Sequence, residues 1–407
     1  MMNINLKRIA EYALYGVILC FSFSKALLEI FVTISIISWL IFIFLNKSEA
    51  KPLRQLIILL STFLIISSIS SFQSDHLETS LRGILKLFKS SMILLIGMHL
   101  FSQHEKLQRL WYVLLCAFGV IVVDSIIQHV FGYDLFRQNP ILYSDTQIRL
   151  TGPFQQYGLL ASFLIAATPI IYVFLTTVRL TSKVKQSAAI SVFIIGLFIL
   201  YKTHSRGAWL AAFVSWIVYA VITKQKKLLL ILILTAFISP LVLPKNALLH
   251  LNIERKEQSL AERYQLWRRA LEVIKARPLF GCGINTYAVN HQKYDTIKHW
   301  RVPGYYAHNG YLQLAAETGL IALALFLTII FISFQNGMKA LRSPPSEEMK
   351  PIFAGIICGA LALLLQAGVD TTLHNLQSAF LIWFFLGLLN AISNIKQNEE
   401  VKAQTNG

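Results

Sequence analysis

Long apolar stretches follow one another along most of this 407-residue chain. A hydrocarbon core about 30 Å thick takes about 20 helical residues to cross, and the stretches approach or reach that length. Twelve of them are candidate membrane spans: 10–28, 30–46, 54–71, 83–101, 108–131, 154–176, 187–203, 207–223, 227–243, 309–334, 352–369 and 376–394. The sequence therefore predicts an all-α integral membrane protein with about 12 transmembrane helices.

The charged residues agree with a membrane protein. Only 14% of the residues are charged, whereas soluble domains average about 25%. The formal net charge is +17, but the lysines and arginines fall in short clusters between the apolar stretches. Because such clusters set the orientation of membrane helices, the charge does not indicate a nucleic-acid partner.

The basic residues of alternate connections predict how the chain is threaded. With a cytoplasmic N-terminus, the positive-inside rule places one group of them on the cytoplasmic side. The group is Lys47, Lys51, Arg54, Lys106, Arg109, Arg179, Lys183, Lys185, Lys224, Lys226, Lys227, Lys339, Arg342, Lys350, Lys396 and Lys402. The predicted layout is nine helices in 1–243, a large periplasmic loop at 244–307, three helices in 308–395 and a cytoplasmic tail at 396–407. Lys7 and Arg8 precede the first stretch as in a signal peptide, but this alternation favours an uncleaved anchor.

The periplasmic loop contains a predicted helix. The segment SLAERYQLWRRALEVIKA has apolar or aromatic residues at 260, 264, 267, 271 and 274, which is a helical period. Ser259 and Glu262 form a capping-box pattern, which predicts that the helix begins at Ser259. Arg277-Pro278 predicts its end, and the glycines of LFGCGINTY then turn the chain.

Basic residues on the predicted periplasmic side are candidates for a binding site, because ionisable groups beside membrane helices usually have a function. Arg149 precedes the sixth stretch, Arg206 begins the eighth, and Arg263 lies in the loop helix. Together they favour a polyanionic ligand such as a pyrophosphate, since guanidinium groups bind phosphate oxygens bidentately. The alternative is that each cation only anchors its helix at the membrane interface.

Three further cations are predicted to share one face of the fourth helix. Arg82, Lys86 and Lys89 are spaced by four and then three residues. A helix that began after Lys89 would be too short to span, so Lys86 and Lys89 are expected in the outer half of the bilayer. They are candidate substrate-binding residues or snorkelling anchors.

His308 and Asn309 stand where the loop meets the tenth stretch. A neutral imidazole can take a proton from an attacking hydroxyl, so His308 is a candidate general base, and Asn309 is a candidate to orient it or the substrate. The alternative for His308 is a polar residue that marks the membrane interface. Glu317 is interpreted as a buried structural carboxylate, and Asp370 as a partner for one of the arginines.

Motifs for several other chemistries are missing from the sequence. It has no Walker loop, HExxH, paired CxxC or GxSxG, and no carboxylate cluster suited to a divalent metal. The four cysteines are scattered and predict no disulfide framework. We therefore expect arginine and lysine, instead of a metal, to neutralise any phosphate.

Four segments resemble bacterial O-antigen ligases and occur in the order seen in that family. They are RLTGPF…LLA (149–161), THSRGAWLA (203–211), SLAERYQLWRRAL…PLFGCGINTY (259–287) and HNGYLQLAAETGLIAL (308–323). The chain departs from the family at 155–158, where QQYG replaces a frequent GNPN. The wider superfamily also contains O-antigen polymerases and protein O-oligosaccharyltransferases.

The resemblance implies a metal-independent, inverting glycosyltransferase of GT-C-like fold, with no cofactor, in the bacterial inner membrane. The implied donor is O-antigen on undecaprenyl pyrophosphate, and the implied acceptor is a sugar hydroxyl of lipid A–core at the periplasmic face. His308 matches the family's base, and Arg149, Arg206 and Arg263 match arginines that hold the departing pyrophosphate. The alternatives are the polymerase, the oligosaccharyltransferase and, less favoured because the polar groups gather at one face, a transporter of lipid-linked glycans.

Overall fold

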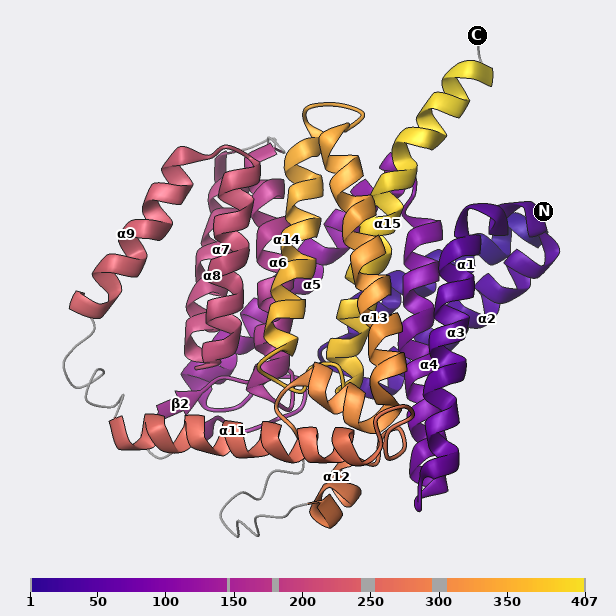
Figure 1. Ribbon diagram of the computed structural model, residues 1–407. Helices are drawn as coiled ribbons and strands as arrows, with labels where there is room; N and C mark the ends of the chain where they lie inside the picture. The colour runs from indigo at the N-terminus through magenta and orange to yellow at the C-terminus, as the bar shows by residue number, and fades with distance from the viewer. Residues whose placement is uncertain (1, 145–146, 178–182, 243–252, 295–305, 406–407) are drawn as a thin grey trace.

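The computed structural model describes residues 2–144, 147–177, 183–242, 253–294 and 306–405 (Figure 1). Within these residues the regular elements are helices and one pair of antiparallel strands, and irregular connections join them. Its elements, in chain order, are α1 Met2–Cys20, α2 Lys25–Leu45, η1 Lys47–Leu53, α3 Arg54–Ile69, η2 Ser70–Gln73, α4 Leu77–Leu100, α5 His104–Phe131, β1 Leu142–Ser144, β2 Gln147–Arg149, α6 Tyr157–Thr177, α7 Lys183–Lys202, α8 Arg206–Ile222, α9 Lys226–Val242, α11 Ile253–Ala276, α12 Tyr287–Asn290, η3 His291–Tyr294, α13 Gly310–Arg342, α14 Met349–Ala367 and α15 Leu376–Thr405.

Each of the predicted membrane stretches corresponds to a long helix, α1–α9 or α13–α15. In the part of the chain that the structure describes, 8 helical segments are long and apolar enough to cross a membrane: Lys25–Leu45, Lys47–Gln73, Leu77–Leu100, His104–Phe131, Tyr157–Thr177, Gly310–Arg342, Met349–Ala367 and Leu376–Ile395. The apolar helices Gln186–Lys202 and Arg206–Ile222 are shorter. The all-α multi-pass fold is confirmed, whereas the count of twelve spans and the side on which the loop lies stay predictions.

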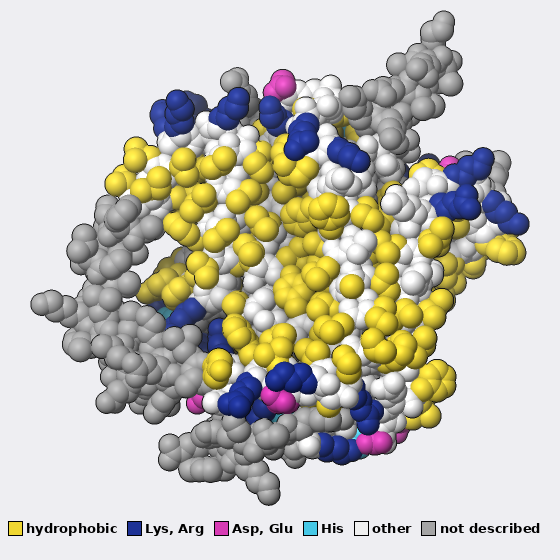
Figure 2. Space-filling view, viewed as in Figure 1, with side chains coloured by type: hydrophobic (Ala, Val, Ile, Leu, Met, Phe, Trp, Pro, Cys, Tyr) yellow, Lys and Arg dark blue, Asp and Glu magenta, His cyan; other side chains and the backbone are white. Residues whose placement is uncertain are grey.

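Most of the long helices run side by side, and α11 lies across one end of the bundle (Figure 1). Both termini lie toward the opposite end. Figure 2 shows a broad band of hydrophobic side chains with Lys and Arg side chains gathered above and below it. This distribution suits a bilayer, because charged groups are costly in hydrocarbon and favourable at its two interfaces.

Polar contacts join the connections at each end of the bundle. At the end that carries the termini, Glu49 of η1 lies 3.0 Å from Lys7 Nζ and 2.8 Å from His99 Nε2. At the opposite end, called the α11 end below, Arg277 Nη1 donates to the Gln73 carbonyl at 2.5 Å. The two connections joined at the α11 end, after α3 and after α11, are ones that the charge pattern assigns to the same side of the membrane.

Close helix packing in the core depends on small residues. α15 packs against α4 and α13, and α14 packs against α6 and α8. At Gly387 of α15 the backbone of α4 approaches so closely that an added Cβ would lie 2.7 Å from the Leu94 carbonyl oxygen. Small residues commonly permit such backbone approach between membrane helices.

Two predicted helix boundaries are wrong. The sequence predicts one span over 10–28, but α1 ends at Cys20 and α2 begins at Lys25, because Ser24 Oγ caps α2 by accepting from Leu27 N at 3.2 Å. α11 begins at Ile253, so Ser259 lies inside the helix and is not its N-cap. The sequence before Ser259 is rich in good helix formers, which extend the helix beyond its apolar period.

Other parts of the loop prediction have different outcomes. The predicted end of the loop helix before Pro278 is confirmed, since α11 ends at Ala276. Residues 244–252 and 295–305 of the predicted loop lie outside the described residues. The β1–β2 hairpin, in which Leu142 pairs with Arg149, was not predicted.

Candidate functional site

His308 lies at the α11 end, directly before α13, and two neighbouring elements hold its backbone. Trp267 Nε1 of α11 donates to the His308 carbonyl at 3.4 Å, and Gly310 N donates to the Asp370 carbonyl at 3.1 Å. His308 has a φ of 47°, in the left-handed region that non-glycine residues seldom adopt. Its side chain is 45% exposed, so the imidazole is fixed at its base and open toward solvent.

Asp370 lies beside the His308 imidazole. Its Oδ1 is 3.8 Å from His308 Nδ1 and accepts a hydrogen bond from Thr371 N at 2.8 Å. Its Oδ2 faces the start of α6, where a Cβ added to Gly158 would lie 3.2 Å away. A carboxylate in this place can orient the imidazole and stabilise its protonated form. The ion-pair partner of Asp370 among the described residues is therefore His308 and not one of the arginines, contrary to the sequence interpretation.

The segment that carries Arg149 is fixed by α5 and α7. Gln128 Oε1 of α5 accepts from Thr151 N at 3.0 Å and from Gly152 N at 2.8 Å. Leu150 N donates to the Lys202 carbonyl at the end of α7, at 3.1 Å. Sequence reasoning did not identify Gln128, because its contacts are with backbone groups in another element.

Arg149 itself has no acidic partner within 4 Å among the described residues. Its Cζ lies 4.9 Å from the centre of the Tyr157 ring, a cation–π contact of about 0.5–2 kcal/mol. Its Nε is buried and has no hydrogen-bond partner in the described structure. The guanidinium is thus held in place while its charge stays uncompensated.

Arg206 and Arg263 come to the same end of the bundle from α8 and α11. Arg206 is exposed, and the neighbouring Gly207 lies against the residue before Asp370: an added Cβ would be 2.6 Å from Val369 Cγ2. Arg263 is half-buried and lies one helical turn before Trp267, the residue that holds the His308 carbonyl. The structure describes no ion pair for either arginine.

Lys202 and His204 complete a group with Arg149 and Arg206, which we call the basic cluster. Burial lowers the pKa of His204 most, and Arg149, Lys202 and Arg206 lower it further. The hydrogen bond from Leu150 N to the Lys202 carbonyl brings the end of β2 to the end of α7, directly before His204 and Arg206. The sequence pattern around His204 does not predict a role for it, because the neighbouring cation Arg149 comes from a distant element.

Asn309 caps α13. Its Oδ1 accepts from Tyr311 N and from Leu312 N, both at 3.1 Å. This is the usual N-cap arrangement, in which a side-chain oxygen satisfies amides that the first helical turn leaves free. The structure thus gives Asn309 Oδ1 a structural partner, while its predicted contact with substrate stays untested.

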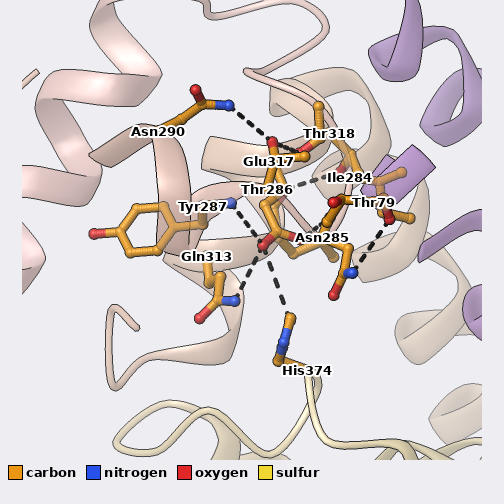
Figure 3. A network of polar contacts seen from close by, with 12 residues as sticks. Thr79, Ile284, Asn285, Thr286, Tyr287, Asn290, Gln313, Glu317, Thr318 and His374 are labelled. Atoms are coloured by element: carbon orange, nitrogen blue, oxygen red, sulfur yellow. Dashed lines mark hydrogen bonds and ion pairs between the residues drawn. The ribbon is translucent and has the colours of Figure 1, made fainter. Parts of the chain in front are cut away.

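Glu317 lies at the centre of a buried polar network (Figure 3). It is 5% exposed and accepts hydrogen bonds from Asn285 N at 2.8 Å, Tyr287 N at 3.3 Å and Gln313 Nε2 at 3.2 Å. His374 Nδ1 lies 3.9 Å from Glu317 Oε1. These contacts agree with the structural carboxylate expected from the sequence.

α13 is broken at Gly319, which has φ 85° and ψ 170°. The segment after α11 fills the break: Leu320 N donates to the Pro278 carbonyl at 2.8 Å, and Cys282 N donates to the Ala316 carbonyl at 2.9 Å. Gly283 N donates to the Glu317 carbonyl at 3.0 Å. Backbone groups freed by the break are thereby satisfied, as membrane helices require.

The cations of α4 separate into two kinds. Arg82 lies 2.6 Å from Glu78 on the same helix, with 76% of its side chain exposed, and Lys89 lies 2.9 Å from Glu29 of α2. Lys86 instead lines a cavity of about 60 Å³ together with residues from α13 and the α14–α15 connection, namely Gly310, Gln313, Glu317 and His374. Among the described residues Lys86 has no ion pair within 4 Å.

This chain is similar to known proteins over part of its length. Residues 191–327 match the family described as O-antigen ligase, a range that includes Arg206, Arg263, His308 and the break in α13. The chain is also similar to the exopolysaccharide production protein ExoQ of Rhizobium meliloti (strain 1021). The two are 29% identical over 143 residues, which are 33% of this chain and 32% of ExoQ, so the match spans about a third of that relative's length. Over about a third of its length, this chain is therefore similar to the O-antigen ligase family and to an exopolysaccharide production protein.

Proposed function

We propose that the chain is an O-antigen ligase of the bacterial inner membrane. It transfers a glycan from undecaprenyl pyrophosphate to a sugar hydroxyl of lipid A–core at the periplasmic face, in lipopolysaccharide biosynthesis. The observation that carries the proposal is the placement of His308, with Asp370 3.8 Å away, at the same end of the bundle as arginines without described acidic partners.

In the proposed reaction His308 Nε2 accepts the proton of the acceptor hydroxyl while Asp370 stabilises the imidazolium. The acceptor oxygen attacks the anomeric carbon from the side opposite the pyrophosphate, so the configuration inverts. The bond between that carbon and the pyrophosphate oxygen breaks, and its electron pair leaves with the pyrophosphate. His308 then releases its proton to solvent.

The arginines act on the leaving group. The departing pyrophosphate gains negative charge in the transition state, and cations already in position stabilise that charge without reorganising. Arg149 suits this task because Tyr157 and the backbone contacts of its segment fix it. Arg206 and Arg263 approach from separate helices, so the pyrophosphate would be held from more than one direction.

A polymerase of the same superfamily is the second candidate. The similarity to an exopolysaccharide production protein favours it, because a polysaccharide that is polymerised would use a growing glycan as one substrate. The donor chemistry and the roles of His308 and the arginines would be unchanged. The two candidates differ in the acceptor.

Lipopolysaccharide banding from a deletion strain separates them. For a ligase, deletion leaves bare core and lipid-linked O-antigen polymer accumulates, and the wild-type gene restores the ladder. For an O-antigen polymerase, deletion leaves core capped by a single O-unit. An unchanged ladder together with loss of a secreted polysaccharide would exclude the ligase and support polymerisation for export.

Arg149→Lys should lower the transfer rate about 10–100-fold, because an ammonium cannot reproduce the bidentate fork or the stacking on Tyr157. The measurement is initial-rate transfer by purified protein with a lipid-linked donor. Arg342→Lys, at the exposed opposite end of α13, is the matched control and should keep the wild-type rate. Full activity of Arg149→Lys would indicate that Arg149 only anchors its segment.

A further inference from the structure

His204 is held rigidly in the connection between α7 and α8. Its φ of 52° lies in the left-handed region, and its amide donates to the Tyr201 carbonyl at 3.1 Å. Its ring centre is 5.9 Å from that of Tyr201 and 6.0 Å from that of Trp209. A strained backbone and two ring contacts fix where this imidazole lies, and such strain often accompanies function.

The charges that act on His204 come from three elements. Lys202 ends α7 and Arg206 begins α8, so they flank His204 in the chain, and Arg149 ends β2 beside Leu150, whose amide donates to the Lys202 carbonyl at 3.1 Å. All three are cationic and lower the pKa of His204. Among the described residues no carboxylate lies within 4 Å of any member of this basic cluster. Lys202 Nζ instead lies 5.5 Å from the centre of the Phe198 ring, and Arg149 stacks on Tyr157.

Burial and these cations lower the pKa of His204 below its ordinary value of about 6.5, so the free imidazole is neutral near neutral pH. A bound polyanion would offset the effect of the cations on the pKa of His204, since its negative charge opposes their field. The imidazole would then gain a proton from solvent and could donate a charge-assisted hydrogen bond to the anion.

We propose that His204 is a further pyrophosphate-binding residue, which becomes protonated when the lipid-linked donor binds and so adds a cation to the fixed ones. The inference rests on the proposed function, because it takes the basic cluster to be the pyrophosphate site. Each phosphate of the intact donor carries one negative charge, and cleavage at the anomeric carbon adds a further charge to the leaving group. The His204 proton stays on nitrogen and donates a hydrogen bond, so the step needs no other reactant.

Proton uptake on binding is the quantity to measure. The probe is a farnesyl pyrophosphoryl monosaccharide, whose phosphates are both diesters and do not titrate near neutral pH. Titration calorimetry of the full-length protein in nanodiscs, in buffers of different ionisation enthalpy, counts the protons taken up. We expect wild type to take up a fraction of a proton, approaching one. Between the pKa of His204 in the free protein and its pKa in the complex, the affinity should rise up to about tenfold for each unit by which the pH falls.

Two variants isolate His204. His204→Gln keeps a hydrogen-bonding side chain, and His204→Asn suits the left-handed backbone, but neither titrates. Both should bind the probe without proton uptake and with affinity independent of pH. His104→Gln, at the start of α5 and exposed at the opposite end of the bundle, should take up protons as wild type does.

The outcomes separate this inference from the proposed function. Binding with equal proton uptake in wild type and His204→Asn would overturn the role of His204 and leave the pyrophosphate site intact. Failure of wild type to bind the probe at all would overturn both. Uptake that disappears in the two His204 variants alone supports the inference.

Discussion

His308→Ala should reduce glycan transfer about 10²–10⁴-fold, the range by which a positioned general base accelerates a reaction. The protein should remain folded, because the contacts that hold this segment use the His308 backbone carbonyl and the Gly310 amide, not the imidazole. Transfer is measured as the initial rate with purified protein and a lipid-linked donor. Thermal unfolding of the same sample checks the fold.

A chemical rescue distinguishes a base from a packing residue. With the imidazole removed from a half-exposed position, added imidazole should restore part of the His308→Ala rate, and the restored rate should follow the concentration of its neutral form. Asp370→Asn should cost less than His308→Ala, since the 3.8 Å separation makes Asp370 an orienting and stabilising group. A His308→Ala protein with the wild-type rate would exclude the general-base role.

The sequence predicted the features that depend on local composition. Apolar stretches located α2–α9 and α13–α15, because burial in hydrocarbon leaves few alternatives to a helix. Their ends were less accurate where polar residues continue a helix: α4 begins at Leu77 and not at 83, and α13 and α15 end at Arg342 and Thr405 and not at 334 and 394. His308 and Arg149 stood out because polar residues at the edge of an apolar stretch are unusual. The same reasoning failed at Ser259, where a capping pattern lies inside a helix whose preceding residues also favour helix.

The contacts that assemble the candidate site could not be predicted in this way. Asp370 could be singled out as an unusual charge, but its partner depends on how the α14–α15 connection packs against the start of α13. Gln128 and Tyr157 fix the Arg149 segment through contacts between separate elements. The sequence around each of these residues does not show which residue of another element it will contact.

The break in α13 is the clearest case of a hidden feature. The sequence AAETGLIALAL continues the apolar pattern through Gly319, so periodicity predicts an unbroken helix. The break instead depends on the 278–283 segment, whose carbonyl and amide groups bond to the separated turns. Each segment satisfies the other's backbone, and at the contact Gly281 and Gly319 both have a positive φ and leave no room for a Cβ.

Gly319→Ala should destabilise the protein severely and abolish transfer. The conformation at φ 85° and ψ 170° is nearly exclusive to glycine and alone costs another residue about 1–3 kcal/mol. An added Cβ would also overlap the Leu279 carbonyl, a backbone group that cannot move without breaking the bond from Leu320 N to the Pro278 carbonyl. Since the same segment continues into Asn285 and Tyr287, whose amides bind Glu317, the damage should reach the buried network around Glu317.

Thermal unfolding in detergent, followed by size-exclusion chromatography, measures the loss of stability. Gly119→Ala is the matched control, because an added Cβ on α5 meets no atom within 4 Å and alanine favours a helix by up to about 1 kcal/mol. The control should unfold at or above the wild-type temperature, whereas Gly319→Ala should unfold well below it or fail to accumulate. A Gly319→Ala protein with wild-type stability would mean that α13 can continue as an unbroken helix past residue 319. It would also mean that the 278–283 segment can pack without the break in α13.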